Sequence, residues 1–166
     1  MSHLEHLQLL TRYRAWADRR LYQALAALPE HVLVTAQPIV FGSLLRTLNH
    51  VYCMDQVWKA HLQGEQHGFT TRNPEDCPPF ETLLASQEDI DDWYIRFATS
   101  LDDRSCDETV RFTFIGGSEG QMRRADILLH VVNHATYHRG HVAAMMYGVP
   151  MLPPTTDLPV FLREAH

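Results

Sequence analysis

The 166-residue chain has few of the features that mark secreted, membrane or nucleic-acid-binding proteins. Its three cysteines are widely spaced and form no C-x-x-C pair, so they predict no disulfide framework and favour a reducing cytoplasm. No segment reaches the ~18 apolar residues that span a bilayer, and no basic stretch precedes an apolar run at the N-terminus. The formal charge is -6, without a run of lysine or arginine. We therefore expect a cytoplasmic protein that binds neither a membrane nor nucleic acid.

The length and the 45% hydrophobic content predict one globular domain over residues 1–166, with enough apolar material to bury a core. Apolar residues recur at helical spacing in four stretches of about 20 residues, each near 30 Å long as a helix. Ser2 and Glu5 have the form of a capping box before the first stretch, while Ser43 and Gly64 can cap the second. The predicted helices span about 3–28, 44–63, 80–101 and 124–147.

The segments between the predicted helices differ in character. Residues 64–79 are rich in proline, glycine and polar residues, which predicts a long connection and suggests a crossover. Val110, Phe112 and Phe114 alternate before a glycine-rich turn, as in a short hairpin. The proline-rich tail from Pro150 onward is expected to be irregular. Together these features predict an all-α four-helix bundle with long crossover connections and a short hairpin-like insertion before the last helix.

Four histidines, His130, His134, His138 and His141, lie close together in the last predicted helix. Because a helix advances about 100° per residue, all four share one narrow face. Two imidazoles one turn apart can bind a single divalent ion. His130 and His138 are separated by ~12 Å along the axis, so at most one adjacent pair can bind the same ion.

A site that does chemistry needs about three protein ligands, so a further ligand must come from another helix. The second predicted helix offers His50 on its inward side. Asp55 lies on the apolar stripe of the same helix and is a candidate to orient one of the ligand histidines. A second interpretation stays open on periodicity alone, in which His50 is a hydrogen-bonded core histidine and the H-x-x-x-H pairs arise by chance.

Three segments resemble motifs of the DinB (DinB/YfiT-like) metalloprotein family. Residues 129–140 (LHVVNHATYHRG) resemble the signature of its last bundle helix. Residues 48–58 (LNHVYCMDQVW) resemble its second-helix ligand motif, and residues 13–18 (YRAWAD) its first-helix aromatic motif. The resemblance spans nearly the whole chain in the right order. The metal ligands that it implies are His50, His134 and His138.

Other polar residues are assigned less direct roles. His130 and His141 are expected to lie beside the ligands or in the core, and the family usually has glutamine at the position of His141. Asp89, Asp91 and Asp92 are predicted to form a solvated face of the third helix. The three tryptophans are predicted to be packing anchors, and the histidines outside these motifs show no convergent pattern.

Zn²⁺ is the first choice for the bound metal and Ni²⁺ the second. Because the three imidazoles are neutral, either ion would keep its full double positive charge. An open position would then lower the pKa of water toward ~7 or hold a thiol as thiolate. The resemblance implies a thiol-dependent S-transferase or isomerase that takes a low-molecular-weight thiol and a small-molecule substrate. A metal-dependent hydrolase and a non-catalytic metal-binding or ligand-binding module are the alternatives. A homodimer is expected, since family members are often dimers and the last predicted helix is apolar on nearly every side.

Overall fold

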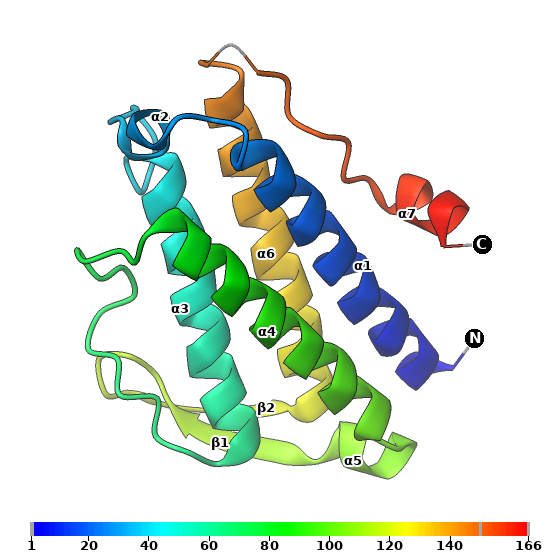
Figure 1. Ribbon diagram of the computed structural model, residues 1–166. Helices are drawn as coiled ribbons and strands as arrows, with labels where there is room; N and C mark the ends of the chain where they lie inside the picture. Colours follow the sequence, from blue (N-terminus) through cyan, green and yellow to red (C-terminus); the bar gives the residue numbers. More distant parts are fainter. Residues whose placement is uncertain (1, 150, 166) are drawn as a thin grey trace.

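Four long helices pack side by side in a bundle (Figure 1). The computed structural model describes residues 2–149 and 151–165, so Met1, Pro150 and His166 lie outside the described part. The bundle helices are α1 (His3–Leu25), α3 (Leu44–Gln63), α4 (Phe80–Ser100) and α6 (Arg124–Met146). Both α1 and α3 pack against α4 and α6, so α1 faces α3 across the bundle and the α1–α3 and α4–α6 connections are crossovers. The predicted four-helix bundle with long crossover connections is confirmed, but residues 64–79 are not one of the crossovers, because they join α3 to its neighbour α4.

The ends of the long helices follow signals in the sequence. The Ser2 hydroxyl accepts a hydrogen bond from the Glu5 N–H at 3.1 Å and the Glu5 carboxylate accepts one from the Ser2 N–H at 2.6 Å, which closes the capping box. Ser43 caps α3 by accepting a hydrogen bond from the Arg46 N–H. Gly64 ends α3 in the left-handed conformation, with φ of 71°. The predicted limits of α3 are therefore confirmed.

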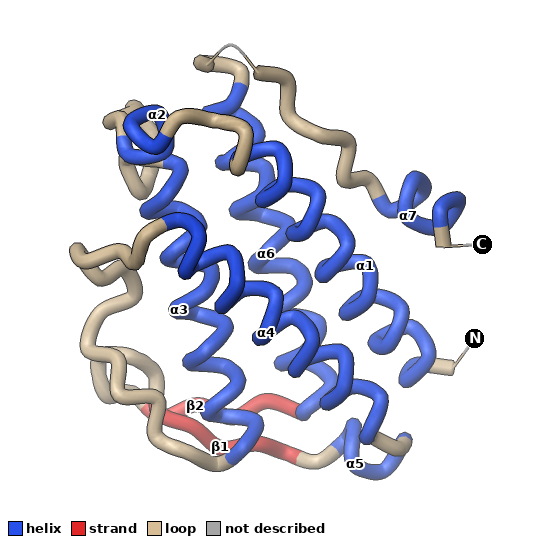
Figure 2. The backbone as a smooth tube through the Cα atoms, viewed as in Figure 1, coloured by secondary structure: helices blue, strands red, loops and turns tan. Residues whose placement is uncertain are grey.

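Short elements cover both ends of the bundle (Figure 2). The helix α1 ends before its predicted limit, and the chain turns into α2 (Glu30–Val34). After α4, the short α5 (Asp103–Asp107) leads to an antiparallel hairpin of β1 (Thr109–Thr113) and β2 (Glu119–Arg123). Gly116 supplies the positive φ, 105°, that the hairpin turn requires. The predicted hairpin before the last long helix is confirmed.

The C-terminal tail contains a further helix, α7 (Leu158–Glu164). Pro159 occupies its first turn, where a helix needs no backbone N–H donor. Phe161 is buried and packs against Tyr13 and Trp16 of α1, with ring centroids 5.8 and 5.6 Å away. The prediction of an irregular tail is wrong for this part, because one buried aromatic side chain docks a short helix on α1.

Buried charged side chains join the bundle helices. Arg14 of α1 donates a hydrogen bond to Asp55 of α3 and lies 3.2 Å from the carboxylates of Asp18 and Asp91. Arg139 of α6 pairs with Asp18 at 3.0 Å. Asp91 is 5% exposed, so the prediction that it belongs to a solvated face is wrong. The guanidinium of Arg14 explains why this carboxylate turns inward, whereas the other two acidic residues of that predicted face are exposed.

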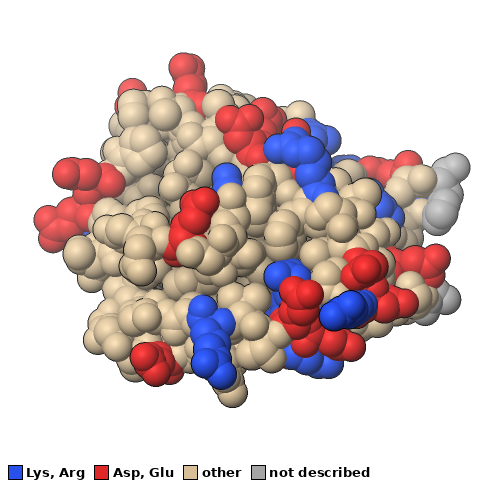
Figure 3. Space-filling view, turned by 90° about the horizontal axis from the view of Figure 1, so that it is seen from below, with Lys and Arg blue, Asp and Glu red and all other residues tan. Residues whose placement is uncertain are grey.

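The outer surface carries charge of both signs. Figure 3 shows the molecule from the hairpin end, where lysine and arginine side chains lie among acidic ones and form no broad basic patch on this face. Among the described residues, no helix is both long enough and apolar enough to cross a membrane.

Candidate metal centre

Three histidines meet where α3 packs against α6. His50 lies on α3, while His134 and His138 lie one turn apart on α6. One ring nitrogen of each residue lies within 4.8 Å of those of the other two, and the Nε2 atoms of His50 and His134 are 3.3 Å apart. The structure thus brings together the three residues that the sequence predicted as a set.

The second nitrogen of each ring has a different environment. Nδ1 of His50 donates a hydrogen bond to the backbone carbonyl of Arg72 at 2.7 Å, which leaves the lone pair on Nε2. Nδ1 of His138 lies 3.2 Å from Nδ1 of His141, so one of these two rings donates to the other. Nδ1 of His134 is buried without a hydrogen-bond partner among the described residues. The Arg72 carbonyl therefore holds the His50 ring with Nε2 left for the cluster, and His141 contacts the His138 ring through Nδ1.

One oxygen of the Asp55 carboxylate is held by neighbouring helices. Its Oδ2 accepts hydrogen bonds from Arg14 and from the Gln87 side-chain amide, the latter at 3.1 Å. Its Oδ1 is buried without a hydrogen-bond partner among the described residues. The Arg72 carbonyl orients His50, and the orientation of another ligand histidine by Asp55 stays a prediction.

The other two histidines of α6 lie beside the cluster. His141 contacts His138 through the nitrogen pair described above. The ring of His130 stacks on His134 with centroids 5.7 Å apart and meets the Trp58 ring edge-on at 4.8 Å. Both side chains are half-buried. The full histidine face of α6 is thus turned toward α3 and the hairpin, as its helical periodicity predicted.

Burial keeps the three imidazoles neutral. It is the largest cause that lowers the pKa of His134 to about 3, and the charges of His138 and His50 lower it further. The pKa of His138 is lowered to about 4, again by burial first and by the neighbouring histidines next. Burial also lowers the pKa of His50. At neutral pH each ring therefore offers a lone pair rather than a positive charge.

The donor set and its spacing fit a divalent cation. Imidazole nitrogen is a common ligand of Zn²⁺ and of neighbouring transition metals. A tetrahedral ion with metal–nitrogen bonds of about 2.0–2.1 Å holds its ligand atoms about 3.3 Å apart. The Nε2 atoms of His50 and His134 are at this separation, and the nitrogen of His138 lies within 4.8 Å of both.

The cluster lies in the wall of a cavity of about 560 Å³. Most of the remaining wall is apolar or aromatic, and no aspartate or glutamate from the described part of the chain lines it. The cavity has the size and the apolar character of a small-molecule site. Besides the cluster, it is lined by Val40, Phe41, Met54, Val57, Trp58, His61, Arg72, Phe114, Ile115, His130, Tyr137 and His141.

Several residues of this site are not apparent from the sequence motifs. Phe41 stacks on the His50 ring with centroids 4.1 Å apart, and Arg72 accepts the His50 hydrogen bond, but both lie outside the long helices. Trp58 and His61 line the cavity from α3. His61 follows His50 by three helical turns, so the helical wheel could have placed it on the same face.

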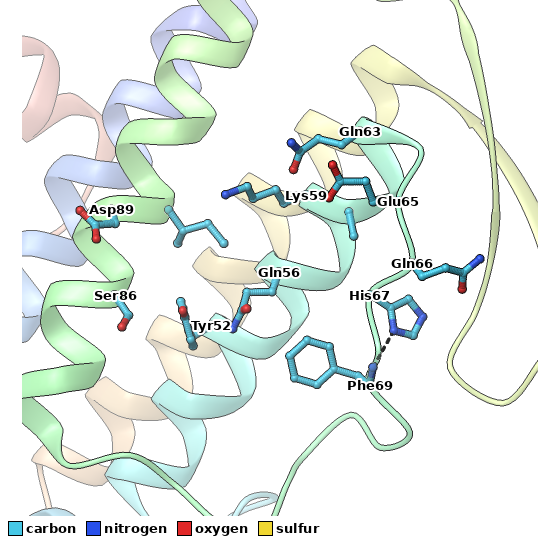
Figure 4. Close-up of a pocket in the computed structure, with 12 residues that line it drawn as sticks. Tyr52, Gln56, Lys59, Gln63, Glu65, Gln66, His67, Phe69, Ser86 and Asp89 are labelled. Carbon is cyan, nitrogen blue, oxygen red and sulfur yellow. Dashed lines mark hydrogen bonds between the residues drawn. The ribbon is translucent and has the colours of Figure 1, made fainter.

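A second hollow lies between α3 and α4 and has a more polar character (Figure 4). Its volume is about 310 Å³, and Gln56, Lys59 and Asp89 are among its lining residues. His67 accepts a hydrogen bond from the Phe69 N–H at 3.0 Å, which engages its Nδ1. Within the described residues, the three-histidine cluster is the one group of histidine, cysteine and acidic side chains close enough to hold a metal ion. The cavity beside the cluster is therefore the candidate functional site.

A helical bundle whose two facing helices present three neutral histidines to an open cavity defines a class of small proteins with a candidate metal centre. Comparison with known sequences assigns the chain within that class. The sequence pattern of the DinB family matches residues 1–165, so the chain belongs to the DinB family. The family resemblance drawn from the three motifs is confirmed.

Two relatives illustrate this membership. The chain is 26% identical over 160 residues to Protein DinB of Bacillus subtilis (strain 168), which covers 92% of this chain and 91% of that protein. Its fold is similar to the crystal structure of a DinB-like protein from Bacillus cereus ATCC 10987, with a TM-score of 0.67. That match covers 87% of this chain and 91% of the other at 16% identity, and it supports the fold alone.

Proposed function

We propose that this protein binds one divalent metal ion, Zn²⁺ first and Ni²⁺ next, through His50, His134 and His138, and uses it in a thiol-dependent transfer reaction. The observation that carries the proposal is the meeting of three neutral imidazole nitrogens within 4.8 Å. Membership of the DinB family supports it.

A divalent ion held by three neutral ligands would lower the pKa of a thiol at an open position and so supply a thiolate near pH 7. The chain's own groups prepare the site. The Arg72 carbonyl fixes the tautomer of His50, and His141 fixes the ring of His138. The apolar wall of the cavity, which includes Phe41 and Trp58, excludes water from the reacting groups.

The transfer reaction needs only two reactants, a thiol and an electrophile with a leaving group. The thiol loses its proton, a sulfur–carbon bond forms with an electrophile, and the bond from that carbon to the leaving group breaks. The products are a thioether, a proton and the leaving group as an anion. No fourth ligand joins the three histidines among the described residues, which supports an open position rather than a closed structural site.

Metal analysis of the purified protein tests the binding step. Wild-type protein, freed of metal and dialysed against Zn²⁺, should retain about one ion per chain, because three imidazoles form a complete protein ligand set for an open site. The variant His50→Ala/His134→Ala/His138→Ala should retain none. His61→Ala removes a histidine from the same cavity outside the cluster and should bind as wild type. Full metal content in the triple variant would refute the assignment.

A hydrolase and a non-catalytic metal-binding module are the competing functions of the same site. Incubation of metal-loaded protein with 2-mercaptoethanol and a chloronitroarene distinguishes them by mass spectrometry. Thioether formation that depends on the three histidines supports the transferase. Loss of the chloride with incorporation of water instead would establish the hydrolase, and the absence of both products with bound metal would favour the non-catalytic module.

A further inference from the structure

The cavity beside the three histidines differs in charge from the protein as a whole. The chain carries a formal net charge of -6, yet no carboxylate of the described residues lines this cavity. Within that same part of the chain, Arg72 is the one lining residue with a permanent charge. An anion that enters the cavity therefore meets no like charge from its lining and one cation.

Arg72 is anchored at its backbone and free at its side chain. Its carbonyl accepts the 2.7 Å hydrogen bond from His50, which ties this part of the connection between α3 and α4 to the bundle. Arg72 also lines the cavity together with the three histidines. Within the described residues, no carboxylate pairs with this side chain, although nine-tenths-buried Arg14 and Arg139 each have acidic partners.

An apolar wall completes the recognition surface. Trp58 of α3 and Phe114 of the hairpin meet edge-on, with centroids 6.5 Å apart, and both line the cavity. Phe114 is 39% exposed, so part of its ring is accessible to a ligand. Aromatic surface of this kind binds the hydrocarbon part of a ligand, while a guanidinium binds a carboxylate through paired hydrogen bonds.

We propose that Arg72 binds the carboxylate of a small-molecule substrate whose apolar part lies against Trp58 and Phe114, next to the three histidines. This inference rests on the proposed function, because the carboxylate can belong to either of two reactants, the thiol or the electrophile. In both cases Arg72 selects an acid over the matching neutral compound and leaves the reacting end near the cluster.

Binding of 2-naphthoate and its neutral analogue 2-naphthamide tests the proposal by fluorescence titration and calorimetry, with and without Zn²⁺. Wild type should bind 2-naphthoate about tenfold more tightly than the amide, as expected for a hydrogen-bonded ion pair. Arg72→Gln keeps the backbone carbonyl and should abolish this preference, while Arg72→Lys should keep part of it. Arg96→Gln removes an exposed arginine of α4 outside the cavity and should behave as wild type.

Two results would overturn the proposal. One is a wild type that binds both compounds equally. The other is a preference for 2-naphthoate that survives in Arg72→Gln and disappears without Zn²⁺, because the carboxylate would then bind the ion.

A second arm of the experiment compares the binding of 3-mercaptopropionate with that of 2-mercaptoethanol. Dependence on Arg72 in this arm assigns the carboxylate to the thiol, and dependence in the naphthoate arm alone assigns it to the electrophile.

Metal content measured on the same samples separates this inference from the proposed function. If Zn²⁺ binds through the three histidines but Arg72 shows no selectivity, the inference fails and the metal centre stands. If Arg72 selects the acid in protein that binds no metal, the proposed metal chemistry fails and the anion site stands.

Discussion

At the scale of single residues, the site depends on imidazoles that are kept neutral by their surroundings. Buried groups with displaced pKa values link site chemistry to stability, because the folded and unfolded chains then take up protons at different pH. His134 and His138 have pKa values of about 3 and about 4 in the folded chain, compared with the usual 6.5.

The first prediction concerns the metal-free protein at mildly acidic pH. Because these pKa values are lowered, the unfolded chain takes up protons on His134 and His138 at a higher pH than the folded chain does. The contribution of the two neutral rings to the free energy of unfolding is therefore complete above about pH 6.5 and is lost as the pH falls toward 4. Urea unfolding from pH 7.5 to 4.5 should therefore show a falling free energy of unfolding. The variant His134→Gln/His138→Gln should show a shallower fall, while His31→Gln, which changes an exposed histidine, should keep the wild-type slope. Identical slopes in all three proteins would contradict the prediction.

The second prediction concerns the neighbour of His138. His141→Leu removes the group that holds Nδ1 of His138 and should weaken Zn²⁺ binding by about 10–100-fold, as loss of a ligand's hydrogen-bond partner does in other metal sites. His141→Gln keeps a hydrogen-bonding group at this position and should bind within about threefold of wild type. Competition with a chromophoric chelator measures both. Equal affinities of the leucine and glutamine variants would show that the contact is not used.

The sequence predicts which three histidines form the cluster better than it predicts their surroundings. His134 and His138 repeat along one helix, and His50 lies within a motif of a second helix, so periodicity and resemblance suffice to select them. Arg72 lies in a long connection with no periodicity, and its contact with His50 depends on how that connection folds back. Helical position likewise gives no information on groups of other helices that compete for Asp55, such as Arg14, which donates a hydrogen bond to its Oδ2.

At the scale of elements, capping residues in the sequence predict where a helix begins and ends. They do not predict which helices contact one another. Ser43 and Gly64 define α3 from sequence alone. The burial of Asp91 could not be predicted, because an aspartate in an amphipathic helix is usually solvated. Its buried partner, Arg14, lies on α1, which is far from Asp91 in the sequence. The same limitation applies to α7, which Phe161 holds on α1.

The third prediction concerns the charged network between the helices. Arg14 is fully buried and contacts the carboxylates of Asp18, Asp55 and Asp91 from three helices. Arg14→Leu would leave these carboxylates without their shared cation and should lower the free energy of unfolding by about 3–5 kcal/mol. Arg12→Leu changes an exposed arginine of the same helix and should cost less than about 0.5 kcal/mol. Chemical denaturation checks both, and a loss below about 1 kcal/mol in Arg14→Leu would show that the network contributes little.

At the scale of the whole molecule, α6 is largely covered by the chain itself. Its apolar residues Leu128, Val132 and Met146 are buried against other elements, while Leu129 is 48% exposed. The apolar character of α6 therefore requires less cover from a second chain than the sequence suggested. We nevertheless propose a homodimer that uses the outer face of α6, where Leu129 is exposed.

The fourth prediction tests this association. Light scattering should give the mass of two chains, and Leu129→Glu should shift the protein to monomer, because a charge at the centre of an apolar contact is costly. Val34→Glu alters an exposed apolar residue of α2 and should leave the mass unchanged. A monomeric wild type at high concentration would contradict the proposal.

The position of the cluster between α3 and α6 determines when in the life of the chain it can form. His50 and His134 are 84 positions apart, and neither helix carries all three rings. Capture of an ion by all three rings would then require α6 to be docked on α3. Metal loading, in the proposed function, would therefore follow the packing of these two helices rather than nucleate either of them.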